Sequence, residues 1–140
     1  MKKINYIQDE SFLHNLLKQT EVKFEKIRIF SGYMNIIPNL ISTISQNIPN
    51  IEIYTSAPKA NSFYKGGKFK SYIPYMYRVY EHNILQHKPK HSNIKIYEYI
   101  KPNWTFHGKG IWLYKRNENT PSISIIGSSN YSKYDLFNTF

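Results

Sequence analysis

The apolar and polar positions of the chain alternate between two periods. Three stretches place apolar residues at every second position, which is typical of half-buried β-strands: KFEKIRIFSGY (23–33), IEIYTSAP (51–58) and IKIYEYI (94–100). Between and before them, apolar residues recur at intervals of three and four, which is the period of a helix. The pattern therefore predicts helices and strands that alternate along the chain.

Three helices are expected from this spacing. The first covers SFLHNLLKQTE (11–21), with Asp9 or Ser11 as its cap. The second has Pro38 in its first turn, where proline is tolerated, and its inward-facing residues are Ile37, Leu40, Ile41 and Ile44. The third begins at Pro74 and runs through YMYRVYEHNILQH (75–87).

Two further strands complete the pattern, FHGKGIWLYK (106–115) and SISIIGSS (122–129), joined by residues 116–121. The predicted order is αβαβαβββ. Short crossover connections would make this an α/β domain with a mixed sheet flanked by helices. The length of 140 residues fits a single domain, and the order of strands in the sheet cannot be derived from the pattern.

The composition of the chain limits the classes of partner and the cellular setting that it can have. The formal charge of +10 predicts a surface that attracts phosphates, whether on nucleic acid, anionic lipid or a phosphorylated metabolite. The absence of cysteine excludes disulfides and thiolate metal ligands, with an intracellular setting as the default. The start of the chain lacks the apolar core of a signal peptide, and no run approaches the roughly 20 apolar residues of a spanning helix.

The stretch WTFHGKGIWLYK (104–115) carries candidate chemistry. In a strand, His107 and Lys109 would share one face, and Gly108 and Gly110 the other. If residues 116–121 closed a symmetrical hairpin, His107 would lie opposite Asn130 and Lys109 opposite Ser128. Such a cluster offers several donors to a phosphate group. The alternative is a strand whose His and Lys merely reach solvent.

FHGKG followed by IIGSSNY resembles the HKD signature of the phospholipase D superfamily, in which His-x-Lys on one strand precedes Gly-Ser-x-Asn on the next. WTFHGKGIWLY is similar to the second HKD motif of the phosphatidylglycerophosphate synthase family. FSGYMNI (30–36) and SAPKANSFYKGGKFKSYIPYMY (56–77) resemble a turn and a loop of the same family. The likeness extends over most of the chain, and it implies a phospholipase D-like half domain over residues 1–140 with one motif, His107–Lys109 and Gly127–Asn130.

The resemblance implies a two-step transfer of a phosphatidyl group from CDP-diacylglycerol to glycerol 3-phosphate. The histidine of one motif attacks phosphorus and CMP leaves, and the glycerol 3-phosphate hydroxyl then opens the phosphatidyl-histidine. By motif position, His107 would be the acid–base partner, with Lys109, Asn130 and Ser128 as the phosphate clamp. No metal or organic cofactor is expected. The family also implies a mitochondrial or related organelle, with peripheral contact to an anionic membrane; a cytoplasmic location is the alternative.

The chain departs from a complete enzyme. Only one His-x-Lys occurs, and the remaining histidines, His14, His82, His87 and His91, are interpreted as structural or solvated. Asp135 falls earlier than the acid that orients a histidine in the superfamily. A second HKD half, in the same protein, in a partner or in a second copy, would therefore have to supply the nucleophile. The alternatives are a homodimeric phosphodiesterase or nuclease, and an inactive remnant that binds phosphate.

The stretch KANSFYKGGKFKSY (59–72) is basic and aromatic, without a period that would bury it. It is expected to be a loop, and the synthase resemblance implies that this loop contacts the CDP head group or acidic lipid. The residues expected to touch substrate are Asn61, Lys65, Gly66, Gly67 and Lys68. A plain solvated loop is the alternative, and nucleic acid is the least favoured partner.

Overall fold

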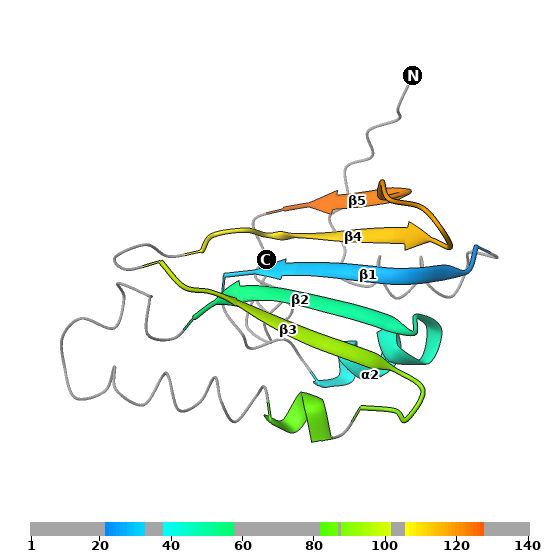
Figure 1. The fold of residues 1–140 in the computed structure, drawn as a ribbon, viewed down its shortest axis with the longest axis horizontal. Helices are drawn as coiled ribbons and strands as arrows, with labels where there is room; N and C mark the ends of the chain where they lie inside the picture. The colour runs from blue at the N-terminus through cyan, green and yellow to red at the C-terminus, as the bar shows by residue number, and fades with distance from the viewer. Residues whose placement is uncertain (1–21, 33–37, 58–81, 87, 102–105, 128–140) are drawn as a thin grey trace, which may run out of the picture.

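A computed structural model describes residues 22–32, 38–57, 82–86, 88–101 and 106–127. They form a five-stranded sheet with helices against it (Figure 1). Its elements are β1 (Phe24–Ser31), α2 (Pro38–Asn47), β2 (Asn50–Ser56), β3 (Asn93–Tyr99), β4 (Gly110–Lys115) and β5 (Ile123–Ile126). Residues 82–86 are helical, and they lie within the third predicted helix.

The sheet is mixed, in the order β3-β2-β1-β4-β5. β1, β2 and β3 run parallel, whereas β4 is antiparallel to β1 and β5 is antiparallel to β4. The predicted α/β class with a mixed sheet is therefore confirmed. The predicted helix over 11–21 lies outside the described residues.

The strand alternation places one set of side chains against the helices. β1 contributes Ile27 and Ile29, which are fully buried. Ile29 lies opposite Ile53 of β2 on one side and Ile111 of β4 on the other, which makes a continuous apolar row. We call this side of the sheet the core face. Burying one such side chain contributes about 1.5–3 kcal/mol.

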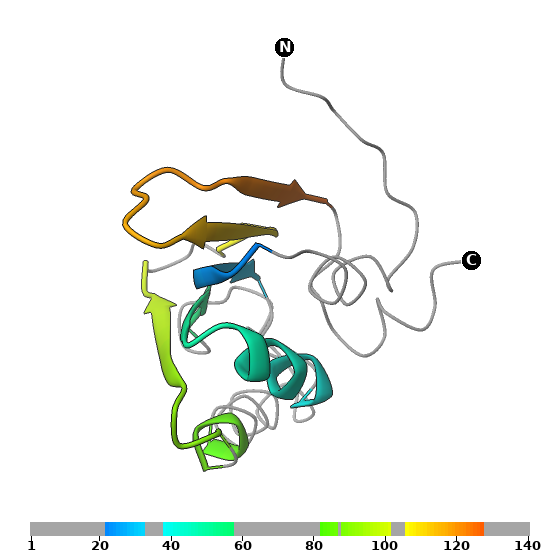
Figure 2. The same ribbon diagram turned by 90° about the vertical axis from the view of Figure 1, so that its right-hand side faces the viewer.

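The helices close the core face. Ile41, Ile44 and Ile48, in and just after α2, share one cluster with Ile84 of the 82–86 helix. Figure 2 shows α2 and residues 82–86 on the same side of the sheet. The expected inward positions Ile41 and Ile44 are thus confirmed, at 4% and 0% exposure. The predicted inward residues Ile37 and Leu40 lack described side chains.

The opposite side, which we call the second face, carries a row of rings across the strands. Phe30 stacks on Tyr54 with ring centroids 4.9 Å apart, and Tyr54 stacks on Tyr97 at 4.8 Å. On its other side, Phe30 lies 4.4 Å from Trp112 in a tilted pair. These offset and tilted pairs each add about 0.5–1.5 kcal/mol beyond area burial. The row ties four strands together.

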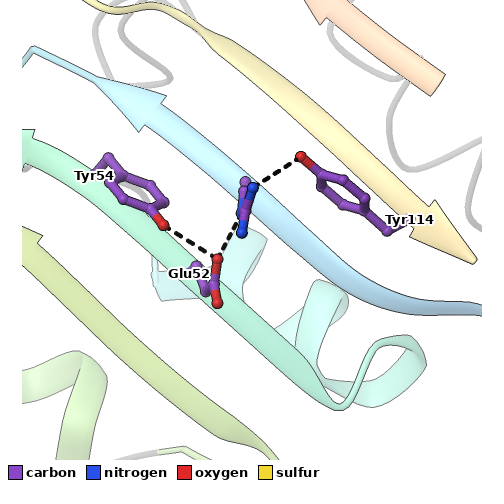
Figure 3. Close-up of polar contacts among 4 residues, drawn as sticks. Glu52, Tyr54 and Tyr114 are labelled. Carbon is purple, nitrogen blue, oxygen red and sulfur yellow. Dashed lines mark hydrogen bonds and ion pairs between the residues drawn. The ribbon is translucent and has the colours of Figure 1, made fainter. Parts of the chain in front are cut away.

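A polar network runs beside this row (Figure 3). Arg28 Nε donates to Glu52 Oε2 at 2.6 Å, and Tyr54 donates its hydroxyl to the same oxygen at 3.2 Å. Arg28 also donates to the Tyr114 hydroxyl at 3.2 Å. The hydrogen bond to Glu52 is the main reason that the pKa of Arg28 is raised. Burial alone would raise the pKa of Glu52, but its bonds to Arg28 and Tyr54 and the nearby charges outweigh burial and lower it.

Two sequence expectations about β4 are corrected. The strand begins at Gly110, so the stretch 106–109 that was expected within it is a non-strand lead-in. Leu113 lies opposite Ile123 and Gly110 opposite Ile126, a pairing shifted by one residue from the symmetrical hairpin. Within the connection, Glu118 N donates to Lys115 O at 3.3 Å, and Asn117 has a φ of 61°. β4 ends at Lys115 and β5 begins at Ile123, so the connection covers 116–122, one residue more than the expected 116–121.

We expect Glu52→Gln to destabilise the chain by about 1 kcal/mol at pH 7, because it removes the charge partner of a partly buried arginine. The pKa of Glu52 in the folded chain lies below its ordinary 4.5. The wild-type stabilisation is therefore complete above that pH and is lost as the pH falls through the folded pKa. Urea unfolding from pH 3 to 7 should show a smaller acid-side decline in the variant. Equal declines in both proteins would contradict this assignment.

Candidate functional site at the carboxyl edge of the sheet

The two candidate residues that the structure describes, His107 and Lys109, lie at one edge of the sheet. The carboxyl ends of the parallel strands β1, β2 and β3 lie together there, and β4 begins at the same edge because it is antiparallel to β1 (Figure 1). We call this the carboxyl edge. It is the usual place for ligands in open α/β sheets, because the strand ends leave side chains and loops unpaired.

His107 and Lys109 approach each other in the lead-in to β4. Lys109 Nζ lies 3.4 Å from His107 Nδ1, so the expectation that the two side chains converge is confirmed. A lysine ammonium can only donate, so Nδ1 is the acceptor in this contact. A neutral His107 ring in this arrangement carries its proton on Nε2. That nitrogen can then donate a hydrogen bond to a bound group.

Phe106 holds this segment in place. Its backbone N–H donates to Ser56 Oγ at 3.4 Å, which connects it to the end of β2. Its ring lies on the second face, with its centroid 6.5 Å from Phe30 and 5.8 Å from Tyr99. His107 is exposed although its neighbour is anchored between three strands. Phe106 is therefore a positioning residue that the sequence analysis missed.

Gly108 makes this anchoring possible. A Cβ built at position 108 would fall 2.9 Å from Phe106 Cε1 and closer still to Cζ, so the ring lies directly over the glycine. A Cβ at Gly110 would meet the backbone oxygen of Ile125 at 2.9 Å, which reflects the close approach of β5. Both glycines of FHGKG thus serve packing around the histidine and the lysine.

Buried hydroxyl groups continue the carboxyl edge on its core side. Ser31 and Thr55 are paired across β1 and β2, at 0% and 1% exposure. Thr55 Oγ1 has no hydrogen-bond partner among the described residues. An unpaired buried hydroxyl costs about 1–3 kcal/mol. The Thr55 hydroxyl is therefore a candidate contact for a group bound at this edge.

The remaining predicted site residues lie outside the described residues: Ser128, Asn130, Asn61, Lys65, Gly66, Gly67 and Lys68. The β4–β5 register is shifted by one residue from the symmetrical hairpin, but its pairs end at Gly110 and Ile126. The pairing of Lys109 with Ser128 and of His107 with Asn130 therefore stays a prediction. Their roles as phosphate ligands remain predictions.

One further described histidine has a structural role. His91 lies 3.0 Å, through Nε2, from the backbone oxygen of Ser45, so it connects the turn before β3 to α2. Within the described ranges, no group of three His, Asp or Glu side chains could hold a metal ion. The same ranges contain no helix long and apolar enough to cross a membrane.

Sequence comparison gives the relatives of this chain. It is 34% identical over 134 residues to the "Probable CDP-diacylglycerol–glycerol-3-phosphate 3-phosphatidyltransferase" of Dictyostelium discoideum, a match that covers 94% of the chain and 23% of that protein. The chain is similar to one segment of these phosphatidyltransferases. The Saccharomyces cerevisiae protein of that name is 31% identical over 119 residues, covering 74% of the chain and 23% of its own length.

A mitochondrial phosphatidyltransferase of the same name from Gallus gallus is 28% identical over 134 residues, covering 94% of the chain and 24% of its own length. No family model matches the chain. The chain therefore spans about a quarter of the length of these phosphatidyltransferases.

Gly108→Ala should displace the Phe106 ring from its place beside Phe30 and Tyr99. We expect a loss of about 1–3 kcal/mol in the free energy of unfolding, the usual cost of overpacking, and changed NMR chemical shifts of the neighbouring His107 ring. Gly127→Ala is the matched control, because a Cβ there meets nothing within 4 Å. Equal unfolding free energies for the two variants would show that the ring does not constrain position 108.

Thr55→Val should stabilise the unliganded chain by about 1 kcal/mol, because valine has the same shape and lacks the unpaired hydroxyl. Thr55→Ser, which keeps a hydroxyl, is the control and should not be stabilised. Denaturant unfolding measures both. A valine variant less stable than the wild type would mean that the hydroxyl has a partner that stabilises the fold.

Proposed function

We propose that this chain is a phospholipase D-like half domain, carrying one HKD-type motif, of a CDP-diacylglycerol–glycerol-3-phosphate 3-phosphatidyltransferase. The similarity over 94% of the chain to proteins of that name carries the proposal. The His107–Lys109 pair at the carboxyl edge supports it.

In this proposal the chain supplies the proton-transfer half of the reaction. A histidine from outside these residues attacks the phosphatidyl phosphorus of CDP-diacylglycerol, and the bond to the CMP oxygen breaks. In its imidazolium form, His107 gives that leaving oxygen a proton from Nε2 and becomes a neutral imidazole. It later takes the proton of the glycerol 3-phosphate hydroxyl as that oxygen displaces the first histidine and forms phosphatidylglycerophosphate.

Lys109 has two tasks in this scheme. In the unreacted arrangement its contact with Nδ1 helps to orient the His107 ring. When a phosphate enters, the ammonium can turn toward the non-bridging oxygens, where a cation stabilises developing negative charge. Asn130 and Ser128 would complete this phosphate clamp, and Asn61, Lys65, Gly66, Gly67 and Lys68 would bind the head group.

The diacylglycerol of the substrate stays in a bilayer, so the protein must work at a membrane surface. The net charge of +10 suits peripheral contact with anionic lipid. The mitochondrial relatives support the same compartment for this chain. A second HKD half, in the same protein, in a partner chain or in a second copy, provides the nucleophile.

The test follows CMP release from radiolabelled CDP-diacylglycerol in the presence of glycerol 3-phosphate. The chain alone should remain near background, because a covalent mechanism without its nucleophile loses several powers of ten in rate. Adding the remainder of the Dictyostelium relative as a separate chain should restore release. His107→Gln should then lower it by about 10²–10⁴-fold.

The controls separate the alternatives. Solution mass fixes the oligomeric state in each assay. Robust turnover by a proven monomer, dependent on His107, would contradict the division of labour between two motifs. Hydrolysis of simple phosphodiesters by a homodimer would instead favour the phosphodiesterase reading.

A further inference from the structure

Four of the six exposed large apolar side chains among the described residues lie toward the carboxyl edge. The two most exposed are Ile100, at 70%, and Ile126, at 79%. Ile100 follows the end of β3, and Ile126 ends β5, so they belong to the two outer strands of the sheet. Tyr97 and Tyr99, which are 40% and 46% exposed, lie near the end of β3.

The strand registers place these residues on both sides of the candidate site. Ile126 lies opposite Gly110, Gly110 opposite Phe30, Phe30 opposite Tyr54, and Tyr54 opposite Tyr97. These five residues make one row across all the strands. His107 and Lys109 lie just beyond this row, in the lead-in to β4 between the two outer strands.

We propose that Tyr99, Ile100 and Ile126 dock the carboxyl edge onto an anionic lipid surface and hold His107 facing it. This inference rests on the proposed function. We call these three residues the edge patch. Tyrosine suits the boundary between water and lipid because its ring is apolar and its hydroxyl is polar. The isoleucines would enter the apolar layer, which removes from water surface that the isolated chain leaves exposed.

The charged side chains around the edge patch favour an anionic lipid surface over a neutral one. Lys101 is exposed directly after Ile100, and Lys109 lies between the two isoleucines at the same edge. Lysines near an anionic leaflet contribute about 1 kcal/mol each, screened by salt. Glu52, the acid of the adjacent second-face network, is already paired with Arg28. The edge therefore combines apolar contact with positive charge, which fits an anionic bilayer better than a neutral one.

This orientation also serves the chemistry. A phosphate attached to diacylglycerol stays within a few ångströms of the bilayer surface, so a catalytic group must face that surface to reach it. The contact of Tyr99 with Phe106, at 5.8 Å between ring centroids, joins the edge patch to the residue that positions His107.

The experiment is vesicle flotation of the whole chain with phosphatidylcholine vesicles, with and without phosphatidylglycerol. The double variant Ile100→Ser with Ile126→Ser should bind the anionic vesicles at least about ten-fold more weakly than the wild type. The matched control is Val22→Ser with Leu85→Ser. These positions are 43% and 44% exposed and lie at the start of β1 and on the 82–86 helix, away from the edge.

Unfolding of both double variants checks that each remains folded. Equal binding by the edge variant and the wild type would overturn the proposal. Equal losses of vesicle binding in both double variants would also overturn it, and so would a wild-type chain that does not bind anionic vesicles. CMP release in the reconstituted assay judges the proposed function separately, with substrate presented in detergent micelles.

Discussion

The antiparallel pairing of β4 with β1 is the constraint on which the candidate site depends. Because β4 runs against the three parallel strands, its amino end meets their carboxyl ends, and the lead-in with His107 and Lys109 arrives at the edge where side chains are free to meet a ligand. Ile29 and Ile111, both fully buried, hold this pairing from the core face. A parallel β4 would have placed the same residues at the far end of the sheet.

The two faces of the sheet are stabilised by different kinds of interaction. The core face depends on aliphatic burial beneath α2 and the 82–86 helix, and isoleucine supplies most of it. The second face depends on stacked rings and on the Arg28–Glu52 pair, whose charges remain partly in water. Contacts among its own side chains therefore contribute to the stability of the second face.

Much of this arrangement was predictable from the pattern of residues. The five described strands follow period-two alternation, because one face of each had to be apolar to build a core. The pairing of His107 with Lys109 followed from the same alternation, although their segment precedes the strand. The hairpin register did not follow, because it depends on the left-handed backbone at Asn117, which side-chain hydrophobicity does not reveal.

Long-range contacts account for the rest of what the sequence could not show. Phe106 looks like any strand aromatic, and its bond to Ser56, fifty residues earlier, exists only after β2 and β4 have been placed in one sheet. That the Thr55 hydroxyl has no hydrogen-bond partner among the described residues is likewise a property of the assembled edge, since threonine in a strand is ordinary.

The ring of Phe106 above Gly108 means that these two positions cannot vary independently. A smaller residue at 106 would free the space over position 108, so an alanine there would become acceptable, but the histidine between them would lose its anchor. An alanine at position 108 alone would crowd the Phe106 ring, and a smaller residue at position 106 alone would leave the histidine without its anchor. Either change by itself is therefore unfavourable. In proteins with the same arrangement of strands at this edge, substitutions at positions 106 and 108 should therefore occur together. A protein with a larger residue than glycine at 108 and an unchanged phenylalanine at 106 should hold its histidine in a different position.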